Sequence, residues 1–88
     1  MRRIFINLNQ VIGGLTNGWT ASVAIAHGGT NGQNEIAIGE SIINPTIQQS
    51  WESIENRVRN LDFLNDEVFF NYRRVNSFEE VEDLVNKL

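Results

Sequence analysis

The fold of this chain is decided by residues 3–42, which read RIFINLNQVIGGLTNGWTASVAIAHGGTNGQNEIAIGESI. Apolar residues alternate with polar or small ones in residues 3–12, 19–26 and 35–42, and a period of two is typical of a half-buried β-strand. The sequence therefore predicts three antiparallel strands that turn one apolar face toward the core, made of Ile4, Ile6, Leu8, Ala21, Val23, Ile25, Ile36 and Ile38.

Two Asn-Gly pairs, at residues 17–18 and 31–32, separate the predicted strands. Asn-Gly readily takes the positive φ angles of a type I′ turn. Hairpins centred on these pairs place Ile12 opposite Val23 and Ile25 opposite Ile38. We therefore expect a three-stranded meander whose second face is small-sided, either open to solvent or closely approached, and made of Ser22, Ala24, Ala26, Ala37 and Gly39.

Helix signals follow the meander. Residues 44–46, Asn-Pro-Thr, predict the start of a helix of about 15 residues, with either Asn44 or Thr46 as the cap. Its apolar stripe is Ile47, Trp51, Ile54, Val58 and Leu61. Residues 68–75 predict a fourth strand, and Ser77 with Glu80 forms a capping box that starts a C-terminal helix.

The resulting element order, β-β-β-α-β-α, predicts an α+β fold with the helices on one face of a mainly antiparallel sheet. The sequence leaves open whether the fourth strand joins the edge of the meander or inserts between its members. Eighty-eight residues build one core, so we expect a single domain over residues 1–88.

The composition of the chain bears on its cellular location. The chain has no cysteine, hence no disulfide framework and no thiolate site, which favours a reducing compartment, and we expect a cytoplasmic protein. The apolar stretch at residues 4–8 is too short for a signal peptide. No stretch reaches the roughly 20 apolar residues of a membrane span, so we expect no membrane contact.

Catalytic motifs are missing from the sequence. His27, the single histidine, precedes Gly28-Gly29 and is similar in that respect to an esterase oxyanion loop, but no Gly-x-Ser-x-Gly nucleophile motif is present. His27 with Glu35, Glu40 or Asp66 has no metal-ligand spacing, and the glycine-rich segments lack the Lys-Ser/Thr of a P-loop. We predict a non-enzymatic protein that uses no cofactor.

Charge points to a class of partner. The chain carries 11 acidic and seven basic residues, a net charge of −4, which disfavours direct binding to nucleic acid. Arg73 and Arg74 are the only basic residues among seven acids between positions 62 and 83, namely Asp62, Asp66, Glu67, Glu79, Glu80, Glu82 and Asp83. A solvated helix face accounts for such acids. A rigid carboxylate-lined surface also imitates the phosphates of a nucleic acid and fits the basic groove of a protein partner.

Residues 31–41, NGQNEIAIGES, followed by the predicted helix, resemble part of a family of small phage anti-CRISPR proteins that inhibit Cas9 by DNA mimicry. The resemblance implies a phage-encoded inhibitor that acts in the host cell cytoplasm on a CRISPR effector. In that family the hairpin turn enters the basic site that reads the protospacer-adjacent motif, which corresponds here to Asn34 and Glu35. This chain opens with a strand where that inhibitor opens with a helix, so the resemblance implies the class of inhibitor and not its particular target.

Two classes of function follow as predictions. The first is a non-enzymatic protein-binding domain that blocks a basic nucleic-acid-binding site of a host defence nuclease through Asn31, Asn34, Glu35, Glu40, Asp66, Glu67, Glu79, Glu80, Glu82 and Asp83. The alternative is a structural or oligomerisation module that self-associates through the small-sided face or through an exposed edge with Phe69 and Phe70. The sequence leaves open whether the chain is a monomer or a homodimer.

Overall fold

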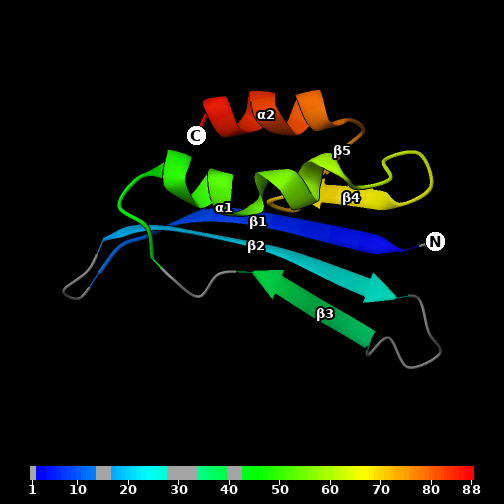
Figure 1. Ribbon diagram of the computed structural model, residues 1–88, viewed down its shortest axis with the longest axis horizontal. Coiled ribbons are helices and arrows are strands. Elements are labelled where there is room, and N and C mark those ends of the chain that lie inside the picture. The colour runs from blue at the N-terminus through cyan, green and yellow to red at the C-terminus, as the bar shows by residue number, and fades with distance from the viewer. Residues whose placement is uncertain (1, 14–16, 28–33, 40–42) are drawn as a thin grey trace.

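The computed structural model describes residues 2–13, 17–27, 34–39 and 43–88, with the elements arranged as in Figure 1. In chain order they are β1 (Arg3–Val11), β2 (Gly18–His27), β3 (Asn34–Gly39), α1 (Ile47–Arg59), β4 (Glu67–Phe70), β5 (Arg73–Val75) and α2 (Phe78–Asn86). The chain therefore has the predicted α+β fold. Neither described helix is long and apolar enough to cross a membrane.

The five strands form one sheet in the order β3-β2-β1-β4-β5. β1, β2 and β3 pair antiparallel as a meander, as predicted. β4, however, lies at the outer edge of the meander and runs parallel to β1, so the sheet is mixed, and the prediction of a mainly antiparallel sheet needs this correction. The reason is the crossover. α1 carries the chain over one face of the sheet from β3 to β4, and a strand that follows such a helix runs parallel to the strand before it. Because β3 and β1 are both antiparallel to β2, β4 is then also parallel to β1.

The predicted fourth strand at residues 68–75 is in fact two strands joined by a two-residue turn. Asn71 and Tyr72 form this turn, with φ angles of 47° and 68°. Positive φ at both central residues is the mark of a type I′ turn, which favours Asn and Gly. The turn escaped prediction because a tyrosine, rather than a glycine, occupies its second position.

Both predicted hairpin registers are wrong, but the predicted assignment of strand residues to the two faces of the sheet is right. Val23 faces Ile6 rather than Ile12, and Ile25 faces Ile36 rather than Ile38. The two slips are of six and two residues, and an even slip keeps every side chain on its own face. The second predicted corner, at residues 31–32, lies outside the described residues.

Gly18 is not a turn residue, contrary to prediction, but the first residue of β2. Trp19 and Asn44 exchange two main-chain hydrogen bonds of 2.8 Å, which bring the chain before α1 against this strand. A Cβ atom on Gly18 would collide with the Asn44 carbonyl oxygen and would lie 2.5 Å from Cγ2 of Ile43. The glycine is therefore required by close approach of two backbones.

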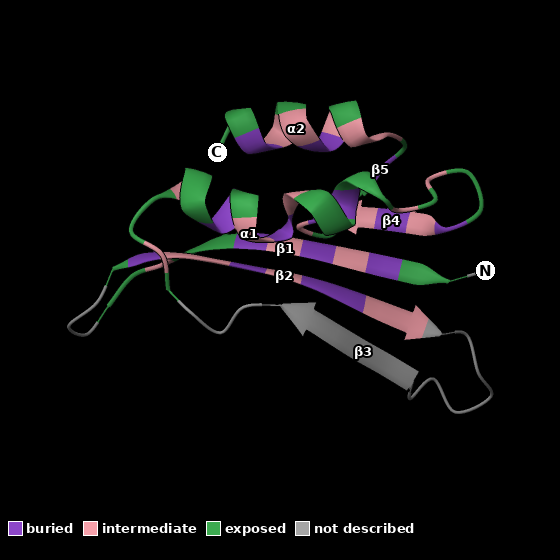
Figure 2. Ribbon diagram, viewed as in Figure 1, coloured by how far each residue is buried: buried purple, intermediate pink, exposed green. Residues whose placement is uncertain are grey.

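Both helices cover the same face of the sheet, and their buried sides are turned toward it (Figure 2). The core comprises Ile4, Ile6, Leu8, Ala21, Val23, Val68, Phe70 and Val75 from the strands and Trp51, Ile54, Val58, Val81 and Val85 from the helices. Thr46 is the N-cap of α1, since its hydroxyl accepts from Gln49 N at 3.2 Å. Ser77 caps α2 as predicted and accepts from Glu80 N at 3.1 Å.

Candidate functional site

The face of the sheet opposite the helices is not covered by any described element, and we call it the open face (Figure 1). Side chains alternate across a strand, so the neighbours of the buried residues of β1 and β4 point to this face. Phe5 and Phe69 are direct partners there, with stacked rings whose centroids are 5.3 Å apart. The ring of Tyr72 lies 6.5 Å from that of Phe5. These three residues form an aromatic cluster.

Two arginines flank the aromatic cluster. Glu67 bridges them, with 3.7 Å to Arg3 Nε and 3.2 Å to Arg74 Nη1. The guanidinium carbon of Arg74 lies 5.8 Å from the centroid of the Phe69 ring, a cation–π distance. Partly exposed ion pairs of this kind add little to stability, so their main effect is to hold the two arginines beside the aromatic rings.

Small residues of β2 continue the open face beyond Phe5. Ala24 is paired with Phe5 and is 7% exposed, while Ser22 and Ala26 are its neighbours on the same face. The predicted small-sided face is therefore present on β2, but Phe5 and Phe69 add an aromatic ridge that the prediction lacked. Ala37 and Gly39 are paired with Ala24 and Ser22, and their side-chain surroundings lie outside what the structure describes.

The predicted exposed edge with Phe69 and Phe70 does not exist. β5 pairs with β4 and takes the edge position, and Phe70 is 3% exposed within the core. Phe69 alone of this pair reaches the open face.

Asp66 and Glu67, two predicted partner-binding residues, are already engaged within the chain. The Asp66 side chain is 8% exposed and pairs with Arg2, whose Nη2 lies 2.7 Å from Oδ2. The hydrogen bond from Arg2 holds the pKa of the Asp66 carboxyl below its ordinary value, against the opposing effect of burial. Asp66 therefore anchors the start of β1 to the α1–β4 loop, and Glu67 orders the arginines of the open face.

The predicted acids of α2 divide into two pairs. The Glu80 carboxylate accepts a hydrogen bond from Asn76 N at 2.8 Å, and Asp83 pairs with Lys87 at 3.0 Å. Glu79 and Glu82 take part in no ion pair with another described residue. Only the second pair is thus left without a partner in the described part of the chain.

Of the remaining predicted residues, two lie in the described strand at the other edge of the sheet. Asn34 and Glu35 belong to β3, which is an edge strand three positions from β4, and nothing is described of their side chains. Asn31 and Glu40 lie outside the described residues. The structure therefore does not gather the predicted residues on one surface. Among the residues it describes, no three acidic or histidine side chains are grouped to hold a metal ion.

Phe5 and Tyr72 are site residues that sequence reasoning did not select. A signal for Phe5 was present, because it places a large apolar residue among the polar positions of the first strand. Tyr72 gave no such signal, since its role depends on a turn that returns it to Phe5.

Comparison with known proteins finds no matching family model, no matching curated protein and no matching solved structure. A function for this chain is therefore argued from its own surfaces.

Proposed function

We propose that this chain is a non-enzymatic protein-binding domain whose contact surface is the open face of its sheet. The observation that carries the proposal is the aromatic cluster of Phe5, Phe69 and Tyr72, ordered beside two arginines on an uncovered face. Aromatic and arginine side chains are enriched at the centres of protein contacts, the aromatics because they bury much area for few rotatable bonds and arginine because its planar guanidinium makes several hydrogen bonds and stacks on rings. The small residues of β2 let a partner approach the sheet closely, and the neighbouring aromatic ridge gives it large apolar side chains to contact.

Charge makes this face the favoured site of approach for a protein. Arg3, Arg74 and Glu67, the charged residues beside the aromatic cluster, sum to +1, whereas the whole chain carries −4, so the rest of the chain carries −5. An acidic partner therefore meets less repulsion at the cluster than over the rest of the chain, since like charges at an interface are costly.

The size of the face favours a partner other than a second copy. Five strands about 4.8 Å apart, with about six residues each at 3.3 Å, span about 500 Å². A stable interface buries about 800 Å² on each partner, so two copies stacked by this face alone would associate only transiently. A different protein that also reaches the neighbouring surfaces is the occupant we propose, and we propose that the two proteins meet in the cytoplasm.

A capture experiment with matched variants tests the proposal. Tyr72→Asn removes the exposed ring and keeps a residue that tolerates positive φ, and Phe69→Thr removes the stacked ring with a strand-favouring residue. Leu64→Asn, at a loop residue that is 94% exposed, is the control for loss of an apolar side chain outside the cluster.

We expect a protein that is retained by the wild type and by Leu64→Asn and lost with Tyr72→Asn plus Phe69→Thr, and that binds again when both components are purified. Sedimentation of the wild type alone should show a monomer at low and at high salt. A stable dimer lost in the cluster variants would assign the face to a second copy instead. Equal capture by all variants, or no capture by any, would contradict the proposal.

A second candidate rests on Glu79 and Glu82, the acids of α2 that make no ion pair with a described residue. In this proposal the chain is an inhibitor of anti-CRISPR type, and its acids occupy a basic nucleic-acid-binding site, for example of a CRISPR effector. Its signature would be capture that weakens steeply with salt and with Glu79→Gln plus Glu82→Gln, and that is indifferent to Tyr72→Asn. The two candidates therefore make opposite predictions for the same set of variants.

A further inference from the structure

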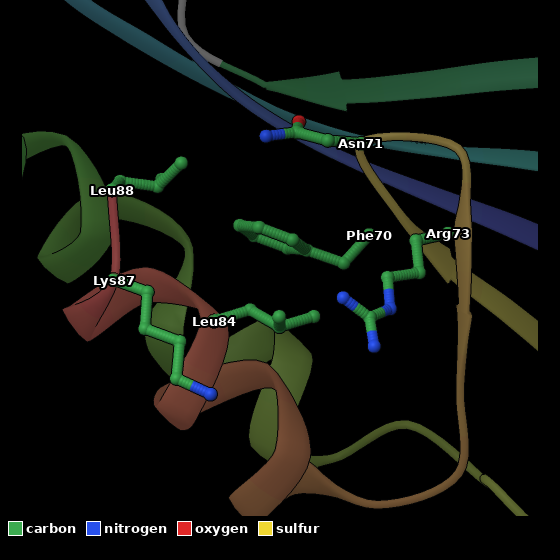
Figure 3. Close-up of a pocket in the computed structure, with 6 residues that line it drawn as sticks. All are labelled: Phe70, Asn71, Arg73, Leu84, Lys87 and Leu88. Atoms are coloured by element: carbon green, nitrogen blue, oxygen red, sulfur yellow. The ribbon is translucent and has the colours of Figure 1, made fainter.

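A pocket of about 290 Å³ opens between α2 and the β4–β5 hairpin (Figure 3). It is lined by Phe70, Asn71, Arg73, Leu84, Lys87 and Leu88. Phe70 is a core residue on the helix-covered side of the sheet, so this pocket is separate from the open face and independent of the function proposed for it.

The floor and the rim of the pocket differ in chemistry. Phe70, Leu84 and Leu88 give it an apolar floor, and Leu88 is 53% exposed although it is a large apolar residue. The charged ends of Arg73 and Lys87, both exposed residues, lie on either side of Leu84 (Figure 3), and we call them the rim. No acidic side chain is among the described residues that line the pocket. The lining thus combines an apolar surface with two cations.

The other polar residue of the lining is engaged in the fold. Asn71 Oδ1 accepts from Leu8 N at 2.9 Å, and Asn71 Nδ2 donates to the Leu8 carbonyl at 3.0 Å. These two bonds fix the uncharged carboxamide against β1, so recognition of a negative charge falls to Arg73 and Lys87.

Both cations are accessible to an anion. Arg73 makes no ion pair with another described residue. Lys87 pairs with Asp83 at 3.0 Å, but both side chains are about two-thirds exposed, and a pair in that setting contributes little. An anion at the rim can therefore pair with Arg73 directly, and it can displace Asp83 from Lys87 at little cost in free energy.

We propose that this pocket binds a small organic carboxylate with an apolar chain or ring. The apolar part would lie against Phe70, Leu84 and Leu88, and the carboxylate would take two parallel hydrogen bonds from the planar fork of Arg73, with Lys87 as a second cation. The volume is at the lower end of small-molecule pockets, which limits the ligand to about ten heavy atoms.

An NMR titration of the ¹⁵N-labelled chain tests the proposal with four compounds of similar size. Octanoate and 3-phenylpropanoate share the carboxylate and distinguish an alkyl from an aryl body, while octanol lacks the charge and octylammonium reverses it. We expect the carboxylates to shift amides near Phe70–Arg73 and Leu84–Leu88, with dissociation constants in the millimolar range for so few atoms. Octanol should bind at least tenfold more weakly, and octylammonium should not bind.

Variants separate recognition at the rim from general attraction of anions. Arg73→Gln should weaken octanoate binding about tenfold, whereas Arg57→Gln, at an exposed arginine of α1 outside the lining, should leave it unchanged. Asp83→Asn releases Lys87 and should tighten binding about twofold. Equal affinity for octanoate and octanol, equal effects of Arg73→Gln and Arg57→Gln, or shifts spread over the whole chain would overturn the proposal.

Discussion

Asn71 holds together parts of the chain that are far apart in sequence, and its replacement gives the sharpest test of the fold. Its side chain makes two hydrogen bonds to the main chain of Leu8, and its own N–H donates to the Ile6 carbonyl at 2.8 Å. The carboxamide thus continues the β1–β4 ladder for one residue past the end of β4, while φ is 47°.

The cost of Asn71→Ala has two parts. Leu8 N–H and C=O lose their partners, at about 1 kcal/mol each in a partly buried setting. Alanine at positive φ adds about 1 kcal/mol. We expect a total loss of about 3 kcal/mol, which for a chain of this length lowers Tm by about 12–24 °C.

Asn71→Gly separates the two parts, because glycine takes positive φ without strain and lacks only the carboxamide. It should therefore cost about 2 kcal/mol, and Asn71→Asp, which still accepts from Leu8 N but turns a carboxylate oxygen toward the Leu8 carbonyl oxygen, should cost at least as much at neutral pH. Urea unfolding of the purified variants measures all three. Losses below about 0.5 kcal/mol for both Asn71→Ala and Asn71→Gly would refute the reasoning.

Two further predictions concern the Asp66 anchor and Gly18. Because Arg2 lowers the pKa of the folded Asp66 carboxyl, its stabilisation is present above the unfolded value of about 3.9 and is lost as pH falls through the lower folded value. Asp66→Asn should therefore lower the urea midpoint at neutral pH. Below about pH 4 the midpoint of the variant should fall less steeply with pH than that of the wild type, and an equally steep fall in both proteins would contradict this. Gly18→Ala should cost about 3 kcal/mol, at the upper end of overpacking costs, because the methyl group collides with the Asn44 backbone as well as with Ile43. Gly13→Ala, where only φ of 126° opposes the methyl group, should cost about 1 kcal/mol, and equal Tm values for the two variants would exclude the close approach.

Local patterns of the sequence determined which residues are buried and where the helices begin. Alternation fixes the face of each strand side chain, so Ile4, Ile6, Leu8, Ala21 and Val23 are buried as predicted although both registers slipped by an even number of residues. Ile25 is only partly buried, and Ala24 is buried on the opposite face. Thr46 was one of two predicted caps for α1, and Ser77 was the predicted cap for α2. These features depend on neighbours within a few positions, which is the range over which a sequence can be interpreted directly.

Tertiary structure alone decided the parallel pairing of β4, the turn at Asn71-Tyr72 and the two candidate binding surfaces. β4 pairs with β1 because α1 returns the chain to the β1 edge of the meander. No local sequence pattern predicts which of the two edges, β1 or β3, will be paired. The antiparallel order of the three strands is thus as predicted, although both registers differ, and the proposed binding surface forms only when β4 brings Phe69 beside Phe5. Asn71 takes positive φ where Leu8, 63 residues earlier, supplies the partners for its carboxamide, and contacts at such separation are set by packing rather than by propensity.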